Sequence, residues 1–280
     1  MRKEQFISML ERCAETGEAM HDETIENFTL TSIRMERVNL TGCEFREIEF
    51  KNVRLKNMIM NGCRFINCSF EGCNFETMKL NRAIFNGCNS SMTVFDGCEM
   101  EGTQISKGRW QVTYWMNCEI PNMQLSELNM RRSIFQGNNM PSVNMIGVEF
   151  EDTRFLHSTV GNSKFIKTSF QETSFDEVSG EQIPNTEFIF CYFGNSIFAS
   201  MDLSGVKFQQ CTFRAGQFVG AFLQDTSFQG SSVNNSNFKS CKFKDTDFRG
   251  CDLSGAIFDD DVDISGMILN EDVKIQAERV

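Results

Sequence analysis

Cysteine is the residue type whose number and spacing in this chain most directly suggest chemistry. Twelve cysteines occur among 280 residues, which is enough for a metal site or a set of disulfides. Four pairs of them share one spacing, with members 20 positions apart: Cys43 and Cys63, Cys68 and Cys88, Cys98 and Cys118, and Cys191 and Cys211. The spacing leaves three interpretations, which are metal ligands, disulfides, or small core residues of a structure that repeats at this interval.

Catalytic motifs are missing from the sequence. His21 and His157 are the only histidines, so neither a nucleophile–histidine–acid triad nor a histidine-rich metal site is indicated. The chain also contains no phosphate-binding loop and no dinucleotide fingerprint. We therefore expect a protein that is not an enzyme and that uses no metal or cofactor.

Acidic residues gather toward the C-terminal end. The net charge is −11, and residues 176–280 contribute −8 of it through sixteen acidic and eight basic residues, whereas residues 25–175 are neutral. The residues that could form an acidic surface there are Asp245, Asp247, Asp252, Asp259, Asp260, Asp261 and Asp263.

Apolar residues recur at every fifth position of the sequence, and the structure that this repeat forms must position all of these residues. Every fifth residue from Ile25 to Phe175 is apolar except Ser90. This period fits neither a helix nor a strand, and a fixed repeat is typical of a solenoid. If each unit turns the chain by a quarter circle, four units complete one coil. The apolar residue then lies at the centre of each side, and a smaller residue two positions earlier also points inward.

The pattern resembles the pentapeptide-repeat family. The units that carry the resemblance are Val38-Asn39-Leu40-Thr41-Gly42, Met201-Asp202-Leu203-Ser204-Gly205 and Cys251-Asp252-Leu253-Ser254-Gly255. The resemblance extends over residues 25 to 269. It implies an all-β fold, a right-handed quadrilateral β-helix with a filled interior.

The repeat also favours one interpretation of the cysteines. All of them except Cys13 fall on the second inward position, so we interpret them as small core residues. Stacked pairs in adjacent coils would keep their Cβ atoms about 4.8 Å apart, beyond the distance that a disulfide prefers. So many free thiols predict a reducing compartment, the cytoplasm of a bacterium or of its host.

The register of the repeat predicts five segments. Residues 1–24 contain an amphipathic helix, with Phe6, Met9, Leu10 and Cys13 on one face, which we expect to cap the first coil; a partner-binding helix is the alternative. A first array follows over 25–175, a register-shift loop over 176–187, a second array over 188–269 and a C-terminal cap over 270–280. Centres of the second array are three residues out of step, and after a further one-residue slip Ile264 and Leu269 resume the pattern.

Residues 20 apart should stack on one outer face. Val94, Tyr114 and Ile134 would then form an apolar stripe with Met116 and Leu156 beside it, a candidate protein contact or homodimer seam. The same face carries a basic cluster. Its members are Arg34, Arg37, Arg54 and Lys56. Further apolar bulk is expected from Ile146 and Ile166, and near the register shift from Ile189, Phe190 and Tyr192.

Two hypotheses for the function follow. The first is a protein-binding scaffold, which includes the pentapeptide-repeat effectors that bacteria deliver into host cells. The second comes from the resemblance, which implies an acidic DNA mimic that binds DNA gyrase or another type II topoisomerase; the neutral first array departs from that pattern. Neither hypothesis involves direct binding of nucleic acid, and no apolar stretch is long enough to span a membrane.

Overall fold

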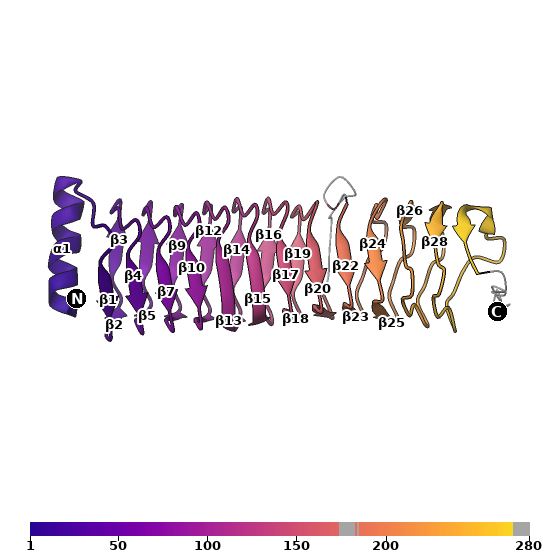
Figure 1. Cartoon of the computed structure of the whole chain (residues 1–280), viewed down its shortest axis with the longest axis horizontal. Helices are drawn as coiled ribbons and strands as arrows, with labels where there is room; N and C mark the ends of the chain where they lie inside the picture. The colour runs from indigo at the N-terminus through magenta and orange to yellow at the C-terminus, as the bar shows by residue number, and fades with distance from the viewer. Residues whose placement is uncertain (174–182, 184, 271–280) are drawn as a thin grey trace. The chain divides into compact units, whose positions relative to one another are not determined.

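The structure, a computed structural model, describes residues 1–173, 183 and 185–270 (Figure 1). Most of the predicted 176–187 loop and residues 271–280 of the predicted C-terminal cap lie outside these residues. The chain divides into two compact units, Met1–Val143 and Asn144–Val280. Both units are all-β parallel solenoids, and an α-helix lies at the N-terminal end of the first, so the predicted fold is confirmed.

Each coil is a sequence of short straight sides joined at corners. Most strands are three residues long, with the middle residue buried and its neighbours facing outward, because side chains alternate along an extended chain. Two residues after each centre the backbone adopts a positive φ, as at Asn52 (53°), Gly62 (66°) and Asn67 (54°). This left-handed conformation, which favours glycine and asparagine, turns the chain onto the next side.

Strands of the first unit pair in parallel with a constant offset of one coil, as Thr24 with Glu44 and Glu44 with Arg64. Three sides are strands, and the fourth is a column of isolated bridges that begins with Ala19–Asn39 and Asn39–Ile59. The strands are β1 (Thr24–Glu26), β2 (Thr29–Thr31), β3 (Arg34–Glu36), β4 (Glu44–Arg46), β5 (Glu49–Lys51), β6 (Arg54–Lys56), β7 (Arg64–Ile66), β8 (Ser69–Glu71), β9 (Asn74–Glu76), β10 (Ile84–Asn86), β11 (Asn89–Ser91), β12 (Val94–Asp96), β13 (Gln104–Gln111), β14 (Tyr114–Met116), β15 (Gln124–Asn129) and β16 (Ile134–Gln136).

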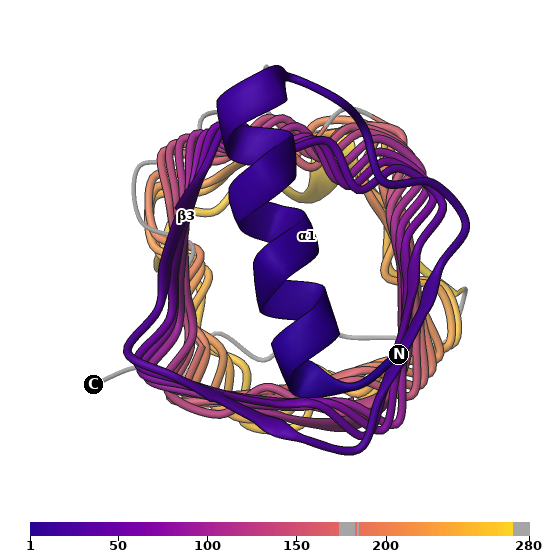
Figure 2. The ribbon, with the colours of Figure 1, turned by 90° about the vertical axis from the view of Figure 1, so that its left-hand side faces the viewer.

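Helix α1 (Lys3–Thr16) closes the first coil. It lies across the opening of that coil (Figure 2) and buries Phe6, Leu10 and Cys13. The Phe6 ring packs edge-on against Phe45, with 6.0 Å between ring centroids. The predicted capping role is confirmed, although Met9 is only half-buried. Covering apolar rings that would otherwise face water is what a solenoid end requires.

Aromatic rings stacked from coil to coil fill the interior. Phe65 and Phe85 lie parallel with 4.5 Å between their centroids. Ser90, the one polar centre of the first array, pairs in register with Phe70 on one side and Trp110 on the other. The indole of Trp110 leans across the small serine until its centroid is 6.3 Å from that of Phe70. The small side chain of Ser90 is therefore explained by the large volume of the neighbouring Trp110 ring.

Gly108 allows a close backbone approach. A Cβ atom at Gly108 would lie 1.9 Å from the carbonyl oxygen of Cys88. This contact with the backbone of the preceding coil leaves no room for a side chain two positions before Trp110. Strand β13 spans eight residues and includes the corner at Lys107, where φ is 56°.

The second inward position carries a hydrogen bond as well as a small side chain. Cys63 Sγ donates to the carbonyl oxygen of Leu40 (2.9 Å), Thr103 Oγ1 to that of Leu80 (2.8 Å), and Ser231 Oγ to that of Phe208 (2.9 Å). In each case the acceptor lies in the preceding coil. Cysteine, serine and threonine can therefore replace one another at this position because each is small and donates.

The second unit repeats this geometry with two changes of offset. Lys164 pairs with Glu187, three positions beyond one regular coil, which confirms the predicted three-residue shift; Glu187 then pairs with Lys207, and the regular offset returns. The elements are β17 (Asn144–Ile146), β18 (Glu149–Glu151), β19 (Arg154–Leu156), β20 (Lys164–Ile166), β21 (Ser169–Gln171), β22 (Glu187–Ile189), β23 (Tyr192–Gly194), β24 (Lys207–Gln209), β25 (Thr212–Arg214), β26 (Phe222–Gln224), β27 (Lys242–Lys244), β28 (Thr246–Asp247), the 3-10 helix η2 (Ile264–Gly266) and β29 (Met267–Ile268).

The end of the second unit partly departs from the prediction. Thr246 pairs with Met267, one position beyond a regular coil, which fits the predicted one-residue slip. The prediction that Ile264 is an inward centre is wrong, because it lies in η2 and is 50% exposed. The carboxylate of Asp263 accepts a hydrogen bond from the amide of Ser265 (2.9 Å) and so caps this helix in place of a straight side.

Candidate functional site

One outer face of the first unit brings the predicted apolar stripe together. The face is formed by β3, β6, β9, β12, β14 and β16, which pair in that order and several of which carry labels in Figure 1. Val94, Tyr114 and Ile134 are in register on β12, β14 and β16. All three are half-buried, as is Met116 two residues after Tyr114. Four of the five residues predicted to bind protein therefore share this face.

The corner before this face adds two apolar residues that the sequence analysis missed. Met92 and Val112 lie two residues before Val94 and Tyr114, at corner positions with φ of 50° and 51°. Met92 is 55% exposed. A left-handed conformation costs an L-residue about 1–2 kcal/mol, and it is most unusual for a β-branched one. We call the six residues Met92, Val94, Val112, Tyr114, Met116 and Ile134 the 92–134 patch.

The basic cluster lies on the same face of the first unit. Arg34 and Arg54 are in register on β3 and β6, and Glu36 is in register with Lys56. Lys56 forms an ion pair with Glu76 on β9. The outward residue just before each buried centre therefore changes along this face. It is arginine on β3 and β6, Asn74 on β9, and an apolar residue from β12 onward.

Leu156, the fifth predicted residue, belongs to the second unit. It is the last residue of β19 and is half-buried. A second apolar column lies within that unit. Ile146, Ile166 and Ile189 are in register on β17, β20 and β22, and the next residue, Phe190, is 53% exposed. The sequence analysis expected Ile146 and Ile166 to stack but did not connect them to Ile189 across the register shift.

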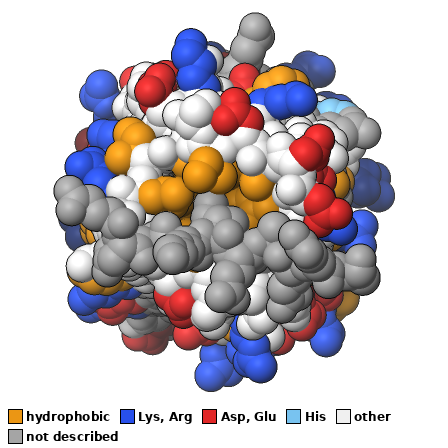
Figure 3. All heavy atoms as spheres, turned by 90° about the vertical axis from the view of Figure 1, so that its right-hand side faces the viewer, with side chains coloured by type: hydrophobic (Ala, Val, Ile, Leu, Met, Phe, Trp, Pro, Cys, Tyr) orange, Lys and Arg blue, Asp and Glu red, His pale blue; other side chains and the backbone are white. Residues whose placement is uncertain are grey.

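The seven aspartates of the predicted acidic surface do not line one side of the second unit. Asp247 and Asp252 occupy successive sides, where they bridge to Ser227 and Ser232. Asp259 follows on a third side and accepts a hydrogen bond from the amide of Ser240 (2.6 Å). Because each side is one repeat long, aspartates spaced by one repeat are distributed around the coil. Figure 3, which faces this end of the unit, shows acidic and basic side chains interspersed.

Several of these carboxylates also have local partners. Arg249 donates to both carboxylate oxygens of Asp247, at 2.9 and 2.8 Å, and this hydrogen bonding lowers the pKa of Asp247. Asp252 accepts two bonds from Ser254, which lower its pKa. From residue 183 to 270 the described part of the chain contains ten acidic and six basic residues, a net charge of −4. Within the described residues the acidic side chains are therefore distributed over several sides and interrupted by basic partners.

The thiols are core groups. All twelve cysteines are free. Burial raises the pKa of Cys63, Cys241 and Cys251 to about 12 and raises that of Cys88 further. A thiol held in its neutral form is a poor nucleophile and a poor metal ligand. Among the described residues no group of three or more His, Cys, Asp and Glu side chains is placed to hold a metal ion.

Two family models match the sequence. Residues 181–258 match a pentapeptide repeat region, and residues 40–84 match nine copies of the pentapeptide repeat. These matches agree with the five-residue sides and the 20-residue register of the structure. The chain is a pentapeptide-repeat protein. No curated protein matches it in sequence, and none of its described helices is long and apolar enough to span a membrane.

Solved pentapeptide-repeat structures are among those that this chain resembles. One is HetL, involved in heterocyst differentiation regulation, from the cyanobacterium Nostoc sp. strain PCC 7120 (13% identity over 91% of this chain and 92% of that chain, TM-score 0.25). Another is full-length QnrB1, a plasmid-mediated fluoroquinolone resistance protein (17% identity over 89% and 94%, TM-score 0.21). These TM-scores are low, so the fold assignment rests on the strand register.

Proposed function

We propose that this pentapeptide-repeat protein is a non-enzymatic protein-binding scaffold and that the 92–134 patch of the first unit is its contact surface. The observation that carries the proposal is the pair Met92 and Val112. Both hold apolar side chains at corners whose left-handed backbone favours glycine or asparagine. The corners of the solenoid share this backbone, and at these two corners the fold holds apolar side chains beside Val94, Tyr114 and Ile134 at a conformational cost.

The surroundings of the patch indicate the chemistry of its partner. Isolated exposed apolar residues are common on protein surfaces, whereas a contiguous apolar patch marks a contact site. The basic cluster lies on the same face, with Arg34 and Arg54 adjacent in register. We therefore expect a protein partner with an apolar segment flanked by acidic residues. In a homodimer the second copy of the chain would bring a second basic cluster to the interface. The homodimer is therefore the alternative, and the experiment distinguishes it from a complex with a different protein.

The alternative of a DNA mimic for a type II topoisomerase receives less support. Such a mimic needs a continuous negative surface, and within the described residues the seven aspartates occupy different sides, with Asp247 paired to Arg249. We also propose a cytoplasmic location, because twelve free thiols suit a reducing compartment.

The test replaces the centre of the patch. Tyr114→Glu places a charge in the patch at an outward, half-buried position, so the melting temperature should change little. The matched control is Gln124→Glu, which places the same charge at an outward position of β15, on another face. Tagged chains are used to capture partners from native lysate, and sedimentation velocity measures the oligomeric state.

We expect Tyr114→Glu to lose a partner that wild type and Gln124→Glu both retain, while all three sediment as monomers. Loss of a dimer in Tyr114→Glu alone would show that the patch binds a second copy. Identical partners and identical sedimentation for the three chains would overturn the proposal.

A further inference from the structure

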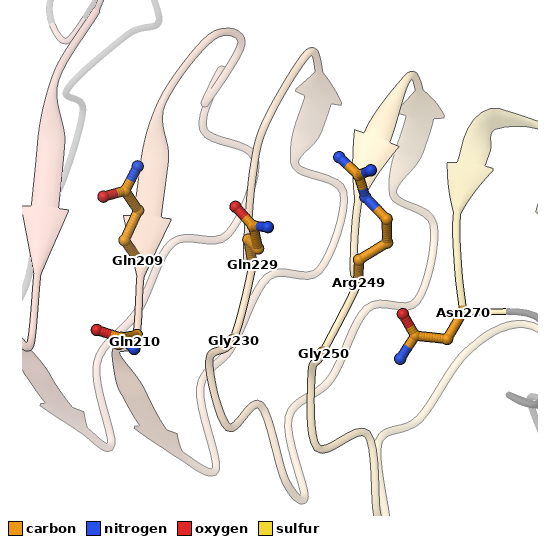
Figure 4. Close-up of a pocket in the computed structure, with 7 residues that line it drawn as sticks. All are labelled: Gln209, Gln210, Gln229, Gly230, Arg249, Gly250 and Asn270. Atoms are coloured by element: carbon orange, nitrogen blue, oxygen red, sulfur yellow. The ribbon is translucent and has the colours of Figure 1, made fainter.

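A polar groove on the second unit is independent of the 92–134 patch and has no role in the function proposed above. It encloses about 510 Å³. Its lining consists of Gln209, Gln210, Gln229, Gly230, Arg249, Gly250 and Asn270. Figure 4 shows Gln209, Gln229 and Arg249 side by side on successive coils, with their side chains pointing the same way. The sequence analysis assigned nothing to these residues.

The five-residue repeat builds this groove from two adjacent columns. One column is the outward position after the centre, which holds Gln209, Gln229 and Arg249. The next column is the corner, which holds Gly230 and Gly250 with φ of 68° and 71°. A Cβ atom on Gly250 would lie 3.6 Å from Gly230, so the two glycines stack directly. Bare corners next to long polar side chains leave the hollow.

The groove is rich in unused hydrogen-bonding groups, and its one charged lining residue is paired outside the lining. The side-chain amides of Gln209, Gln210, Gln229 and Asn270 make no hydrogen bond to another side chain of the described residues, and each offers both a donor and an acceptor. Arg249, the single charged lining residue, forms a bidentate pair with Asp247. The site therefore presents planar polar groups without a free charge.

An exposed aromatic ring stands beside the groove. Phe190 occupies the same corner column one coil before Gln210 and two coils before Gly230, and its backbone amide donates to the carbonyl oxygen of Gln209 (3.0 Å). The residue is 53% exposed and its φ is 55°, which is an unusual conformation for a bulky side chain. Phe190 thus adds an apolar surface next to the row of amides.

We propose that this groove binds a neutral oligosaccharide. Vicinal hydroxyls of a sugar both donate and accept, so they pair with amide side chains, and the C–H face of a pyranose ring packs against an aromatic ring such as Phe190. An anionic ligand lacks an unpaired cation among the lining residues. A purely apolar ligand would leave the amides without water or a partner, at a cost in free energy.

The spacing of the amides also argues against an extended peptide. Coils follow each other at about 4.8 Å, whereas an extended peptide repeats every two residues, or about 6.6 Å. A peptide along the groove would therefore lose its match to Gln209, Gln229 and Arg249 within two coils. One sugar ring for each coil keeps the match.

The experiment titrates the full-length chain with cellohexaose, maltohexaose, chitohexaose and mannohexaose by isothermal calorimetry, and maps contacts by saturation-transfer NMR. We expect at least one of them to bind. Gln229→Ala removes an amide and Gly230→Asn fills the floor with a residue that tolerates a positive φ; each should weaken binding tenfold or more. Gly205→Asn is the matched control, since Gly205 is a corner glycine (φ 73°) outside the groove, and it should bind as wild type does.

Three results would overturn the proposal. One is the absence of binding by all four hexasaccharides at millimolar concentration. Another is unchanged affinity in Gln229→Ala, a surface substitution whose folding is checked by circular dichroism, so that misfolding of Gly230→Asn cannot obscure the outcome. The third is preferential binding of a heparin hexasaccharide, which would show that charge and not hydroxyl recognition determines the ligand.

Discussion

In the first unit the outward side chains of Val94, Tyr114 and Ile134 are apolar, whereas the second unit presents Gln209, Gln229 and Arg249 at successive coils of its groove. The corners differ as well. All of these corners have a left-handed backbone, but Val112 places an apolar side chain there, whereas Gly230 and Gly250 place none. The inward residues of both units are nevertheless stacked aromatic rings. The comparison teaches that one packing rule fixes the interior and leaves the outer positions free to specialise.

The largest expected effect tests whether the two interiors are equivalent. Phe70→Ala in the first unit and Phe208→Ala in the second each remove a buried, stacked ring. Each should lower the free energy of unfolding by about 3–5 kcal/mol, measured by urea denaturation. A loss in one unit that is several kcal/mol smaller than in the other would contradict the equivalence.

The next effect concerns the one polar centre of the first unit. Ser90→Phe would restore an aromatic centre where Trp110 already fills the space. We expect overpacking to cost about 1–3 kcal/mol in the free energy of unfolding. Combining Ser90→Phe with Trp110→Leu should recover part of that loss in the same urea experiment. A stabilised Ser90→Phe variant would show that the serine does not compensate for the tryptophan.

A smaller effect concerns the ion pair between Asp247 and Arg249 in the second unit. Arg249 lowers the pKa of Asp247, so the folded state holds this carboxylate more strongly in its charged form than the unfolded chain does. The resulting stability is present above the ordinary aspartate pKa of about 3.9 and is lost as the pH falls through the lower folded value. Because Arg249 is more than half exposed, the contribution is less than about 1 kcal/mol.

Urea unfolding of Asp247→Asn at pH 7 and at pH 2.5 measures this contribution. The variant should be less stable than wild type at pH 7, and the difference should be smaller at pH 2.5. Asp260→Asn, at an exposed aspartate outside the pair, is the control and should match wild type at both values. A pH-independent difference for Asp247→Asn would contradict the account.

Spacing alone predicted the interior and much of the apolar stripe. A five-residue period fixes which side chains face inward, and a 20-residue coil fixes that Val94, Tyr114 and Ile134 align. Backbone angles are not contained in that spacing, so the strained corners at Met92 and Val112 escaped prediction. They could have been found as apolar residues at a corner position that in most other coils holds a polar residue or glycine, as at Asn52 and Gly72.

The hydrogen bonds of the small inward residues could not be predicted from the spacing either. Size explained why Cys63 and Thr103 are small, but the hydrogen bonds to Leu40 and Leu80 depend on carbonyl groups of the preceding coil. The interruption of the acidic surface had a similar cause. A charge count includes Asp247 and Arg249 but does not show that they pair.

The central claim, that Val112 holds its apolar side chain for a partner at a cost to the fold, is tested most directly by Val112→Asn. Melting temperature and partner capture are measured on the same preparation, beside Lys107→Asn, which relieves another left-handed corner (φ 56°) outside the patch. We predict that both variants melt at least as high as wild type and that only Val112→Asn loses the partner. A lower melting temperature for Val112→Asn, or undiminished capture, would contradict the claim.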